Sequence, residues 1–381
     1  MFLYGLTRLT ANRPSIKTNS EQNTRNEKMP GKQIDNSVFP VYNHTDFFFQ
    51  EGNMKKTSKM IMMVLVVMMF LCISVSASAE TVLQFGTTVN EQDSFQVAAE
   101  KFAELVKERT DGAYVIEIYP NGTLGGEADM LESMSMGMLD MGIITAGPFV
   151  NYSSMMGVLD MPFLFANNEE AYKILDGEIG HELLDTLEDA GLKGLAYAER
   201  GFRNITNSVK PVASAADVAG LKLRVMENEV YTATFKALDV NAVPMNWQDT
   251  LTALQQGTVE GQENPINVIW SYKMWEYNQK FCVLDRHSYS TAIITMSLDL
   301  FNSLDAETQQ IFIDAAQEAA EYERAWVAEQ EAGQLQEIKD NGIEVVEDPD
   351  VDSFREAVQV VYDAYPQYAD YIARIQAELA E

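Results

Sequence analysis

The stretch "GLKLRVMEN", residues 220–228, predicts a short buried strand that delivers charged side chains where it ends. Leu221, Leu223 and Val225 alternate along it, as residues on one face of a β-strand do. Arg224 and Glu227 then arrive at the carboxyl end of the strand. An arginine on a protein surface needs no such placement, whereas an arginine that holds an anion does. From the spacing alone, a structural ion pair between Arg224 and a nearby glutamate remains the alternative.

Strand and helix patterns alternate on both sides of this stretch, which predicts an α/β fold. Periodicities of two and of 3.6 residues separate the two kinds of segment, and residues 259–265 are expected to form a loop. The predicted strands are 81–86, 113–120, 140–145, 191–199, 220–225 and 240–245, and the predicted helices are 93–110, 126–138, 168–189, 229–238 and 247–256.

Residues 303–341 predict one helix of nearly forty residues with no internal proline. Asp305 is a suitable N-cap and Asn341 a suitable end, and Gly333 weakens the helix without having to break it. At 1.5 Å per residue such a helix is about 60 Å long, which is enough to run across two lobes. Two further helices, interrupted near Pro366, are predicted beyond it.

The amino-terminal part carries the pattern of an export signal. Residues 54–79 combine a basic start, an apolar run and a small-residue site at 77–79, which predicts a signal peptide cleaved before Glu80. The apolar run is short for a membrane-spanning helix, and cleavage is favoured over lipidation at Cys72. Residues 1–53 are polar and aperiodic; we interpret them as a misassigned upstream start, with a disordered extension as the alternative. The expected location is the periplasm.

Composition limits the classes of function. The chain has 381 residues, enough for two domains, and 46% are hydrophobic, so it can bury a core. A formal net charge of −30 argues against nucleic acid or an anionic membrane surface as partner. Beyond residue 79 only Cys282 remains, so no internal disulfide is expected. Nucleophile-elbow, zinc-protease, P-loop and dinucleotide-binding motifs are absent from the sequence, so neither catalysis nor a cofactor or metal is predicted.

The scarce arginines point to anion binding. Arg200 and Arg203 are predicted to lie just past the strand 191–199, and Arg224 at the end of the following strand. Ligands of open α/β sheets bind outside the carboxyl ends of strands, and an arginine can bind a carboxylate through two parallel hydrogen bonds. The alternative is structural pairing with Glu199 and Glu227.

Two other stretches add candidate ligand contacts. "GQENP" places the amide of Asn264 in a segment fixed by Pro265, where it could donate to and accept from a ligand. Turn formation is the alternative for Asn264. Trp247 opens the helix 247–256 and offers either a flat wall of a cleft or ordinary core packing.

Several stretches in order carry a resemblance to a known family. They are "AAEKFAELVKERTDG", "IYPNGTLGGEADMLE", "LDMPFLF", "GLKLRV", "VPMNWQDTLTALQQGTVEGQENP" and the long helix. Together they make the chain, from residue 80 to 381, similar to the substrate-binding proteins of tripartite ATP-independent periplasmic (TRAP) transporters, the DctP-like group. The resemblance implies a two-lobed periplasmic-binding-protein-like fold that closes over a small acid. We expect lobe I to comprise 80–201 and 290–329, and lobe II to comprise 202–289 and 330–381, with the long helix spanning both.

The resemblance also implies ligand-binding residues. Arg224 matches the arginine that forms a two-pronged salt bridge with the ligand carboxylate, and Arg203 matches a second arginine, with a one-residue length difference between them. Glu227 stands where sialic-acid binders often have an amide, and Thr145 lies near the position of their first-lobe glutamate, so sialate is disfavoured. The full expected set is Arg224, Arg203, Asn264, Trp247, Glu227, Thr87, Thr145 and Tyr289.

These observations predict an exported, monomeric binding protein that captures a small organic carboxylate and delivers it to TRAP membrane subunits. Glu227 would repel a second carboxylate and accept hydrogen bonds from hydroxyls, which favours a hydroxylated monoacid such as a hexuronate. A C4-dicarboxylate ligand is the alternative within the same system. A secreted enzyme using Glu227 or Glu263 as a base, and a diffusible sensor, are the alternatives of other classes.

Overall fold

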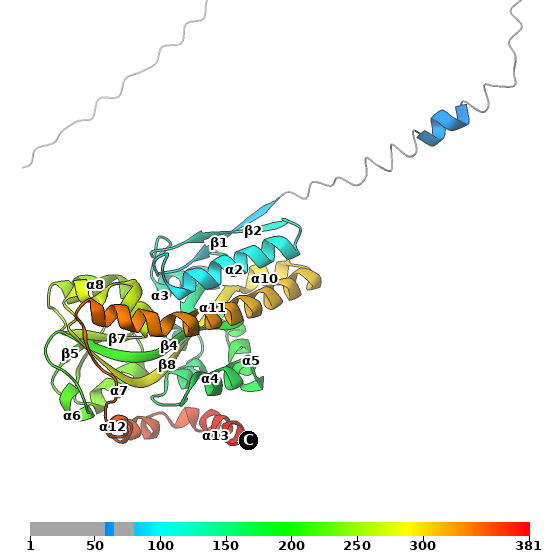
Figure 1. The fold of residues 1–381 in the computed structure, drawn as a ribbon. Helices are drawn as coiled ribbons and strands as arrows, with labels where there is room; N and C mark the ends of the chain where they lie inside the picture. Colours follow the sequence, from blue (N-terminus) through cyan, green and yellow to red (C-terminus); the bar gives the residue numbers. More distant parts are fainter. Residues whose placement is uncertain (1–57, 65–79) are drawn as a thin grey trace, which may run out of the picture. The chain divides into compact units, whose positions relative to one another are not determined.

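The computed structural model describes residues 58–64 and 80–381 (Figure 1). Residues 58–64 are helical. The predicted extension 1–53 and the cleavage site at 77–79 lie outside the described residues. In the part of the chain that the structure describes, none of the helices has the length and hydropathy needed to cross a membrane.

Residues 80–381 are built around one mixed sheet of nine strands. Its order is β2-β1-β3-β8-β4-β7-β5-β6, with β9 paired to β8. The strands are β1 (Thr81–Gly86), β2 (Tyr114–Tyr119), β3 (Met141–Thr145), β4 (Leu192–Asn207), β5 (Lys222–Val225), β6 (Asn241–Pro244), β7 (Gly261–Asn264), β8 (Phe281–Ser297) and β9 (Glu344–Val346). β2, β1 and β3 run parallel, as do β7, β5 and β6, and the long strands β4 and β8 lie antiparallel between these two groups.

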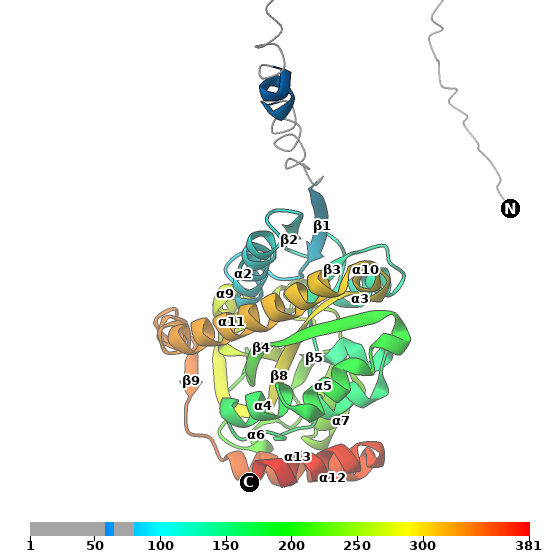
Figure 2. The same ribbon diagram turned by 90° about the vertical axis from the view of Figure 1, so that its right-hand side faces the viewer.

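β4 and β8 therefore connect the two ends of the sheet (Figure 2). The register of this pair shifts between Glu199 and Gly201 and again between Arg203 and Ile205, which is the mark of β-bulges. Gly201 adopts a φ of 96° at the first shift, a conformation that glycine alone adopts without strain. The prediction that Arg200 and Arg203 lie past the strand is wrong: β4 continues to Asn207, because β7 and β8 provide hydrogen-bonding partners on both sides of it.

The prediction of a loop at 259–265 is also wrong, because residues Gly261–Asn264 form the fully buried strand β7. This segment is polar, so its sequence lacks the apolar pattern of a buried strand. Gly261 makes the pairing possible: a Cβ at this position would lie 2.1 Å from the carbonyl oxygen of Thr206 in β4.

The helices follow the predicted alternation closely. They are α2 (Ser94–Arg109), α3 (Glu127–Ser135), α4 (Asn168–Leu175), α5 (Glu178–Asp185), α6 (Ala215–Val218), α7 (Glu229–Ala237), α8 (Trp247–Gln255), α9 (Ile266–Ser271), α10 (Leu298–Ser303), α11 (Ala306–Asp340), α12 (Val351–Ala364) and α13 (Ala369–Leu379). The single helix predicted at 168–189 is instead divided into α4 and α5, and Gly177 is the N-cap of the second.

The long helix is α11, of 35 residues. Asp305 caps it as predicted, because its carboxylate accepts hydrogen bonds from the backbone N–H groups of Glu307 and Thr308. Gly333 does not interrupt it. At 1.5 Å per residue α11 is about 52 Å long, and it packs successively against α2, β4 and α9 (Figure 1).

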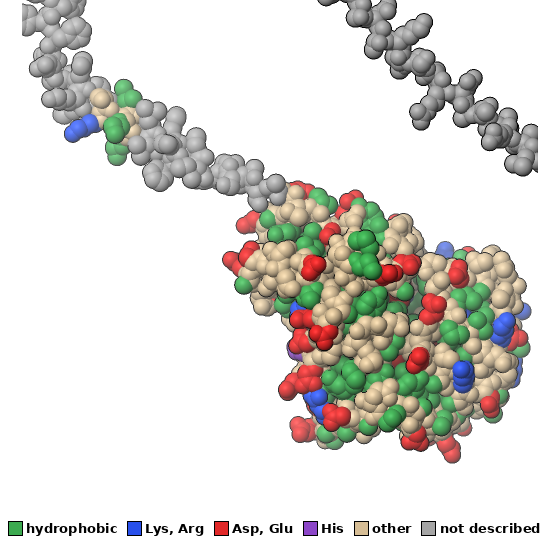
Figure 3. Space-filling model, turned by 180° about the vertical axis from the view of Figure 1, so that it is seen from behind, with side chains coloured by type: hydrophobic (Ala, Val, Ile, Leu, Met, Phe, Trp, Pro, Cys, Tyr) green, Lys and Arg blue, Asp and Glu red, His purple; other side chains and the backbone are tan. Residues whose placement is uncertain are grey.

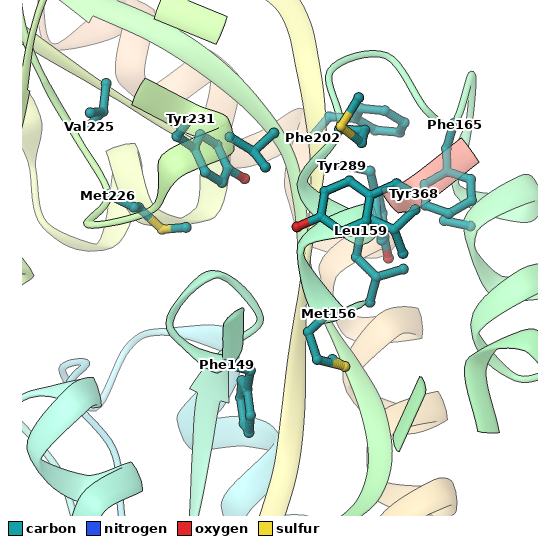
Figure 4. Close-up of a cluster of buried hydrophobic side chains, with 14 of the residues drawn as sticks. Phe149, Met156, Leu159, Phe165, Phe202, Val225, Met226, Tyr231, Tyr289 and Tyr368 are labelled. Atoms are coloured by element: carbon teal, nitrogen blue, oxygen red, sulfur yellow. The ribbon is translucent and has the colours of Figure 1, made fainter. Parts of the chain in front are cut away.

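The apolar core lies on both sides of the long strands. One cluster joins β1, α2, β3 and the first half of α11, and includes Phe85, Phe102 and Phe312. A larger cluster lies under α4, α5, α7 and α12; Figure 4 shows Phe165, Phe202 and Tyr289 gathered within it. On the face shown in Figure 3, acidic side chains clearly outnumber basic ones.

Candidate functional site

Arg224 is buried, and no acidic side chain in the described part of the chain pairs with it. Arg224 is the last residue but one of strand β5, and it is 4% exposed. Its Nε and Nη2 donate to the carbonyl oxygen of Met245 at 2.9 and 2.7 Å. Within residues 58–64 and 80–381, no carboxylate oxygen lies within ion-pair distance of its guanidinium. A guanidinium has five N–H donors, so three of those of Arg224 remain for another acceptor.

The charge of Arg224 survives this burial. Removal from water lowers the pKa of its guanidinium to about 10, the nearby positive charge of Arg203 acts in the same direction, and the carboxylates of Glu263, Glu127 and Glu227 oppose them. The side chain is therefore a cation at neutral pH. A buried cation without a counter-charge is costly unless an anion joins it, so the structure presents an anion site at Arg224.

A cavity of about 620 Å³ opens beside Arg224. Trp247 forms part of its wall, with its ring centroid 5.6 Å from the guanidinium carbon of Arg224, and packs edge-on against Tyr272. The segment 147–151 and the turn before α3 also contribute lining residues. Besides Arg224 and Trp247, the lining includes Gly122, Gly126, Glu127, Asp129, Pro148, Asn151, Met226, Glu227, Met245, Gln248 and Asp249.

Four acidic side chains also line the cavity. Glu127, Asp129, Glu227 and Asp249 all line it. Glu127 was not predicted from the sequence, although it opens the helix that follows "YPNGTLGG". Its Oε1 accepts from both the backbone N–H and the hydroxyl of Thr145, at 2.9 and 2.7 Å. Thr145 thus holds Glu127 at the cavity wall and does not itself line the cavity.

Arg203 has a different environment from Arg224. It lies in β4 and forms a buried two-pronged pair with the carboxylate of Glu263 in β7. Burial would raise the pKa of Glu263, but the charge of Arg203 and hydrogen bonds from His287 and Arg203 lower it to about 2. His287 lies between Glu263 and Asp285, at 3.3 and 2.7 Å. The sequence suggested the wrong partners for Arg203, because the residue facing it across the sheet is 60 positions away.

Three other expected residues, Asn264, Thr87 and Tyr289, do not line the cavity. The amide nitrogen of Asn264 donates to Gln262 in the same strand. Thr87 is fully buried beside Val89. Tyr289 is 2% exposed and contacts Phe202 edge-on, with 5.2 Å between ring centroids. Of the eight expected residues, the cavity therefore brings together Arg224, Trp247 and Glu227.

A second cavity is a weaker candidate. It has a volume of about 240 Å³, lies between α11, α5 and β4, and is lined in part by Arg324 and Asp176. Arg324 already donates to both carboxylate oxygens of Asp176, at 2.5 and 2.9 Å. Its charge is thus neutralised within the protein, unlike that of Arg224. Among the described residues there is also no cluster of three or more histidine, cysteine, aspartate or glutamate side chains suited to a metal ion.

Residues 85–368 match the family described as bacterial extracellular solute-binding protein, family 7. The chain belongs to this family. The 2,3-diketo-L-gulonate-binding periplasmic protein of Escherichia coli is 38% identical to it over 307 residues, covering 79% of this chain and 93% of that protein. The C4-dicarboxylate-binding protein of Bacillus subtilis is 31% identical over 262 residues, covering 69% of this chain and 75% of that protein.

The fold of this solute-binding protein matches that of solved family members. A TRAP periplasmic solute-binding protein from Polaromonas sp. JS666, bound to D-erythronate, has a TM-score of 0.77 and 40% sequence identity, covering 78% of this chain and 99% of that one. The resemblance drawn from the sequence is thereby confirmed, and so is the two-lobed α/β fold class. The division into lobes at residues 201/202 and 289/290 stays a prediction.

Proposed function

We propose that this protein is the exported ligand-capturing subunit of a TRAP transporter and that its ligand is a hydroxylated monocarboxylic acid, such as a hexuronate or an aldonate. The observation that carries the proposal is Arg224: a buried, charged guanidinium beside a cavity of about 620 Å³, with three N–H groups that bond to no described residue. Two of these N–H groups can bind one carboxylate in parallel.

The charge of the cavity supports a single carboxylate on the ligand. Glu127, Asp129, Glu227 and Asp249 line the cavity together with only one arginine. Like charges brought together in a site cost several kcal/mol, so a second carboxylate on the ligand would be rejected. Carboxylates accept hydrogen bonds from hydroxyl groups, which a sugar acid supplies along its whole length.

The relatives favour the same class. The diketogulonate-binding and erythronate-bound proteins, both ligands being sugar acids, are 38% and 40% identical to this chain. The dicarboxylate-binding relative is 31% identical. C4-dicarboxylate binding therefore stands as the second candidate.

Binding would proceed by closure of the two lobes. Arg224 anchors the carboxylate, Trp247 covers the ligand, and exclusion of water strengthens the hydrogen bonds. Arg203, Asn264, Thr87, Thr145 and Tyr289 would complete the site in the closed form. The ligand shifts the equilibrium only to the extent that it binds the closed form better than the open one.

The same proposal extends to export and partners. The signal peptide 54–79 would direct the protein to the periplasm and be removed near Ala79. There the protein would act as a monomer and deliver its ligand to the TRAP membrane subunits. It would perform no chemistry on the ligand, so galacturonate incubated with the purified protein is expected to be recovered unchanged; recovery of a product would contradict this part.

A thermal-unfolding screen tests the ligand class. Binding to the folded state alone stabilises it by RT ln(1 + [L]/Kd), about 2.7 kcal/mol at a hundredfold excess over Kd. We expect galacturonate, glucuronate or galactonate to raise the melting temperature and succinate, malate and fumarate to leave it unchanged. Stabilisation by the dicarboxylates alone would overturn the sugar-acid proposal in favour of the second candidate.

A further inference from the structure

Glu323 is a buried carboxyl group in the middle of α11 whose hydrogen bonding is incomplete. Its side chain is 0% exposed. Its Oε2 accepts from the backbone N–H of Glu199 in β4 at 2.9 Å. Its Oε1 is buried and has no hydrogen-bond partner among the described residues. A carboxylate has about four lone-pair sites to satisfy, so this environment suits an ionised carboxylate poorly.

The residue that it contacts sits at the bulge in β4. The register of β4 against β8 shifts between Glu199 and Gly201, and α11 crosses the sheet at this point. The link from Glu323 to Glu199 thus joins the long helix to the irregular part of the strand. Four residues after Glu199, the same strand carries Arg203, whose charge acts on Arg224.

A second buried carboxyl group faces Glu323. Glu199 is 1% exposed. Its side chain accepts from the amide of Asn168 at 3.0 Å and from the hydroxyl of Tyr172. A negative charge on Glu199 disfavours a second one on Glu323, because both groups are buried.

The other charged groups nearby do not compensate for two negative charges on Glu199 and Glu323. The titratable or polar groups that face the two carboxyls are Tyr172 from α4, Arg286 and Tyr289 from β8, Arg324 and Glu331 from α11, and Ser94 from α2. Of the two arginines, Arg324 is already paired with Asp176. Burial, and next the charge of Glu199, raise the pKa of Glu323 well above its usual range.

Ser94 offers the missing partner for a protonated Glu323. Its hydroxyl is buried and, within the described part of the chain, unpaired. Burial and the charge of Glu199 raise the pKa of Glu323 and outweigh the lowering effect of Ser94 as a hydrogen-bond donor. A neutral carboxylic acid has one O–H donor. With the proton on Oε1, Glu323 can donate to the hydroxyl oxygen of Ser94 while Oε2 keeps its bond from Glu199, which would satisfy both unpaired atoms.

We propose that Glu323 is a positioning residue for ligand binding: as a neutral carboxylic acid it ties α11 to the Glu199–Gly201 bulge of β4 and thereby sets the placement of the strand that carries Arg203. The role of Glu323 at the bulge can be tested without ligand, whereas its effect on affinity rests on the proposed function. The proton is held in the folded protein and released to water when the chain unfolds above the ordinary pKa of glutamate, about 4.3. Stability therefore falls as the pH rises from this value toward the raised pKa of the folded state.

Two substitutions and a control separate positioning from simple packing. Glu323→Gln reproduces the neutral acid, since it keeps an acceptor for Glu199 and a donor for Ser94. Glu323→Met keeps the side-chain volume but accepts no strong hydrogen bond. Glu329→Gln removes a charge from an exposed position of the same helix and serves as the control.

The first measurement uses the ligand-free protein. Amide exchange in the segment 195–205 is expected to be unchanged in Glu323→Gln and Glu329→Gln and faster in Glu323→Met. Glu323→Gln is also expected to melt at a higher temperature than the wild type at about pH 8, with the gap narrowing toward about pH 5. Equal pH profiles for wild type and Glu323→Gln, or undisturbed exchange in Glu323→Met, would overturn the proposal.

The second measurement is galacturonate affinity by titration calorimetry. We expect Glu323→Gln to bind within about twofold of the wild type and Glu323→Met to bind more weakly, by up to about tenfold, the limit reached when the whole cost of the lost hydrogen bond from Glu199 falls on ligand binding. Wild-type affinity in Glu323→Met would show that the residue is only structural. If galacturonate does not bind even the wild type, the ligand proposal is affected, and the exchange and pH measurements still decide the role of Glu323.

Discussion

The guanidinium of Arg224 donates two hydrogen bonds to the carbonyl oxygen of Met245, the residue that follows β6 in the chain. Met245 precedes the helix α8, whose first residue is Trp247. One backbone carbonyl thus orients the arginine and fixes it next to the aromatic wall of the cavity. The bonds use the Nε side of the guanidinium, which leaves the Nη1 edge free for a ligand.

Replacing Arg224 by lysine should reduce ligand affinity while preserving the fold. Lysine keeps the positive charge but has no planar fork, so a two-pronged interaction becomes a single one. The loss of a hydrogen bond between charged groups is about 1.5–3 kcal/mol, which is roughly tenfold or more in Kd. Calorimetric titration with galacturonate measures it, with the exposed Arg355→Lys as control. An unchanged Kd would reject Arg224 as the anchor.

Glu227 should control the number of carboxylates that the ligand can carry. It is exposed, lines the cavity and follows Arg224 by three residues. In Glu227→Gln the repulsion of a second carboxylate is reduced, so we expect the affinity for malate to rise relative to that for galacturonate. The shifts in melting temperature that malate and galacturonate cause report the ratio of the two affinities. Glu229→Gln, an exposed change on the next helix, is the control; if both variants shift the ratio equally, Glu227 has no special role.

His287 should make stability depend on pH above neutrality. Burial alone would lower its pKa, but Asp285 and Glu263 raise it to about 9. The folded protein therefore holds a proton that the unfolded chain, with a pKa of about 6.5, releases first. The resulting stabilisation is complete below about pH 6.5 and is lost as the pH rises through about 9.

Urea unfolding at several pH values measures this contribution. The difference in unfolding free energy between wild type and His287→Gln should shrink by at most roughly 3 kcal/mol between about pH 6 and 9.5. The decrease in stability with pH that Glu323 causes is the same in wild type and His287→Gln, so it cancels in this difference. Parallel curves across this range would mean that His287 is neutral in the folded state.

Two glycine substitutions should have opposite effects on stability. Gly333 lies inside α11, and an added Cβ would meet no atom within 4 Å, so Gly333→Ala should stabilise the protein by about 0.5–1 kcal/mol. At Gly157 a Cβ would lie 2.1 Å from the hydroxyl oxygen of Tyr368, which donates to the carbonyl of Ser154. Gly157→Ala should therefore destabilise it. Chemical unfolding of both variants measures the change in unfolding free energy. The prediction fails if the two changes have the same sign.

The secondary structure near the site follows mostly from local patterns. The alternation in 220–225 and the N-cap at Asp305 act between neighbours in the chain, so they were visible in the sequence, whereas the break at Gly177 was not. β7 was not, because "GQEN" is polar and becomes a strand only through its pairing with β4 and β5. The full length of β4 was missed for the same reason.

The α/β class, the long helix and the position of Arg224 near the end of its strand could be read from the sequence alone, because they depend on periodicity and on residue type. Which arginine lacks a carboxylate partner among the described residues depends on how the strands pack together. Arg203 meets Glu263 across two strands, whereas Arg224 meets a backbone carbonyl and a cavity. Glu127 and Glu323 likewise gained their roles from contacts with Thr145 and Glu199 that are distant in the chain. Charge pairing depends on distance in space, and that distance is set by the packing of the whole sheet.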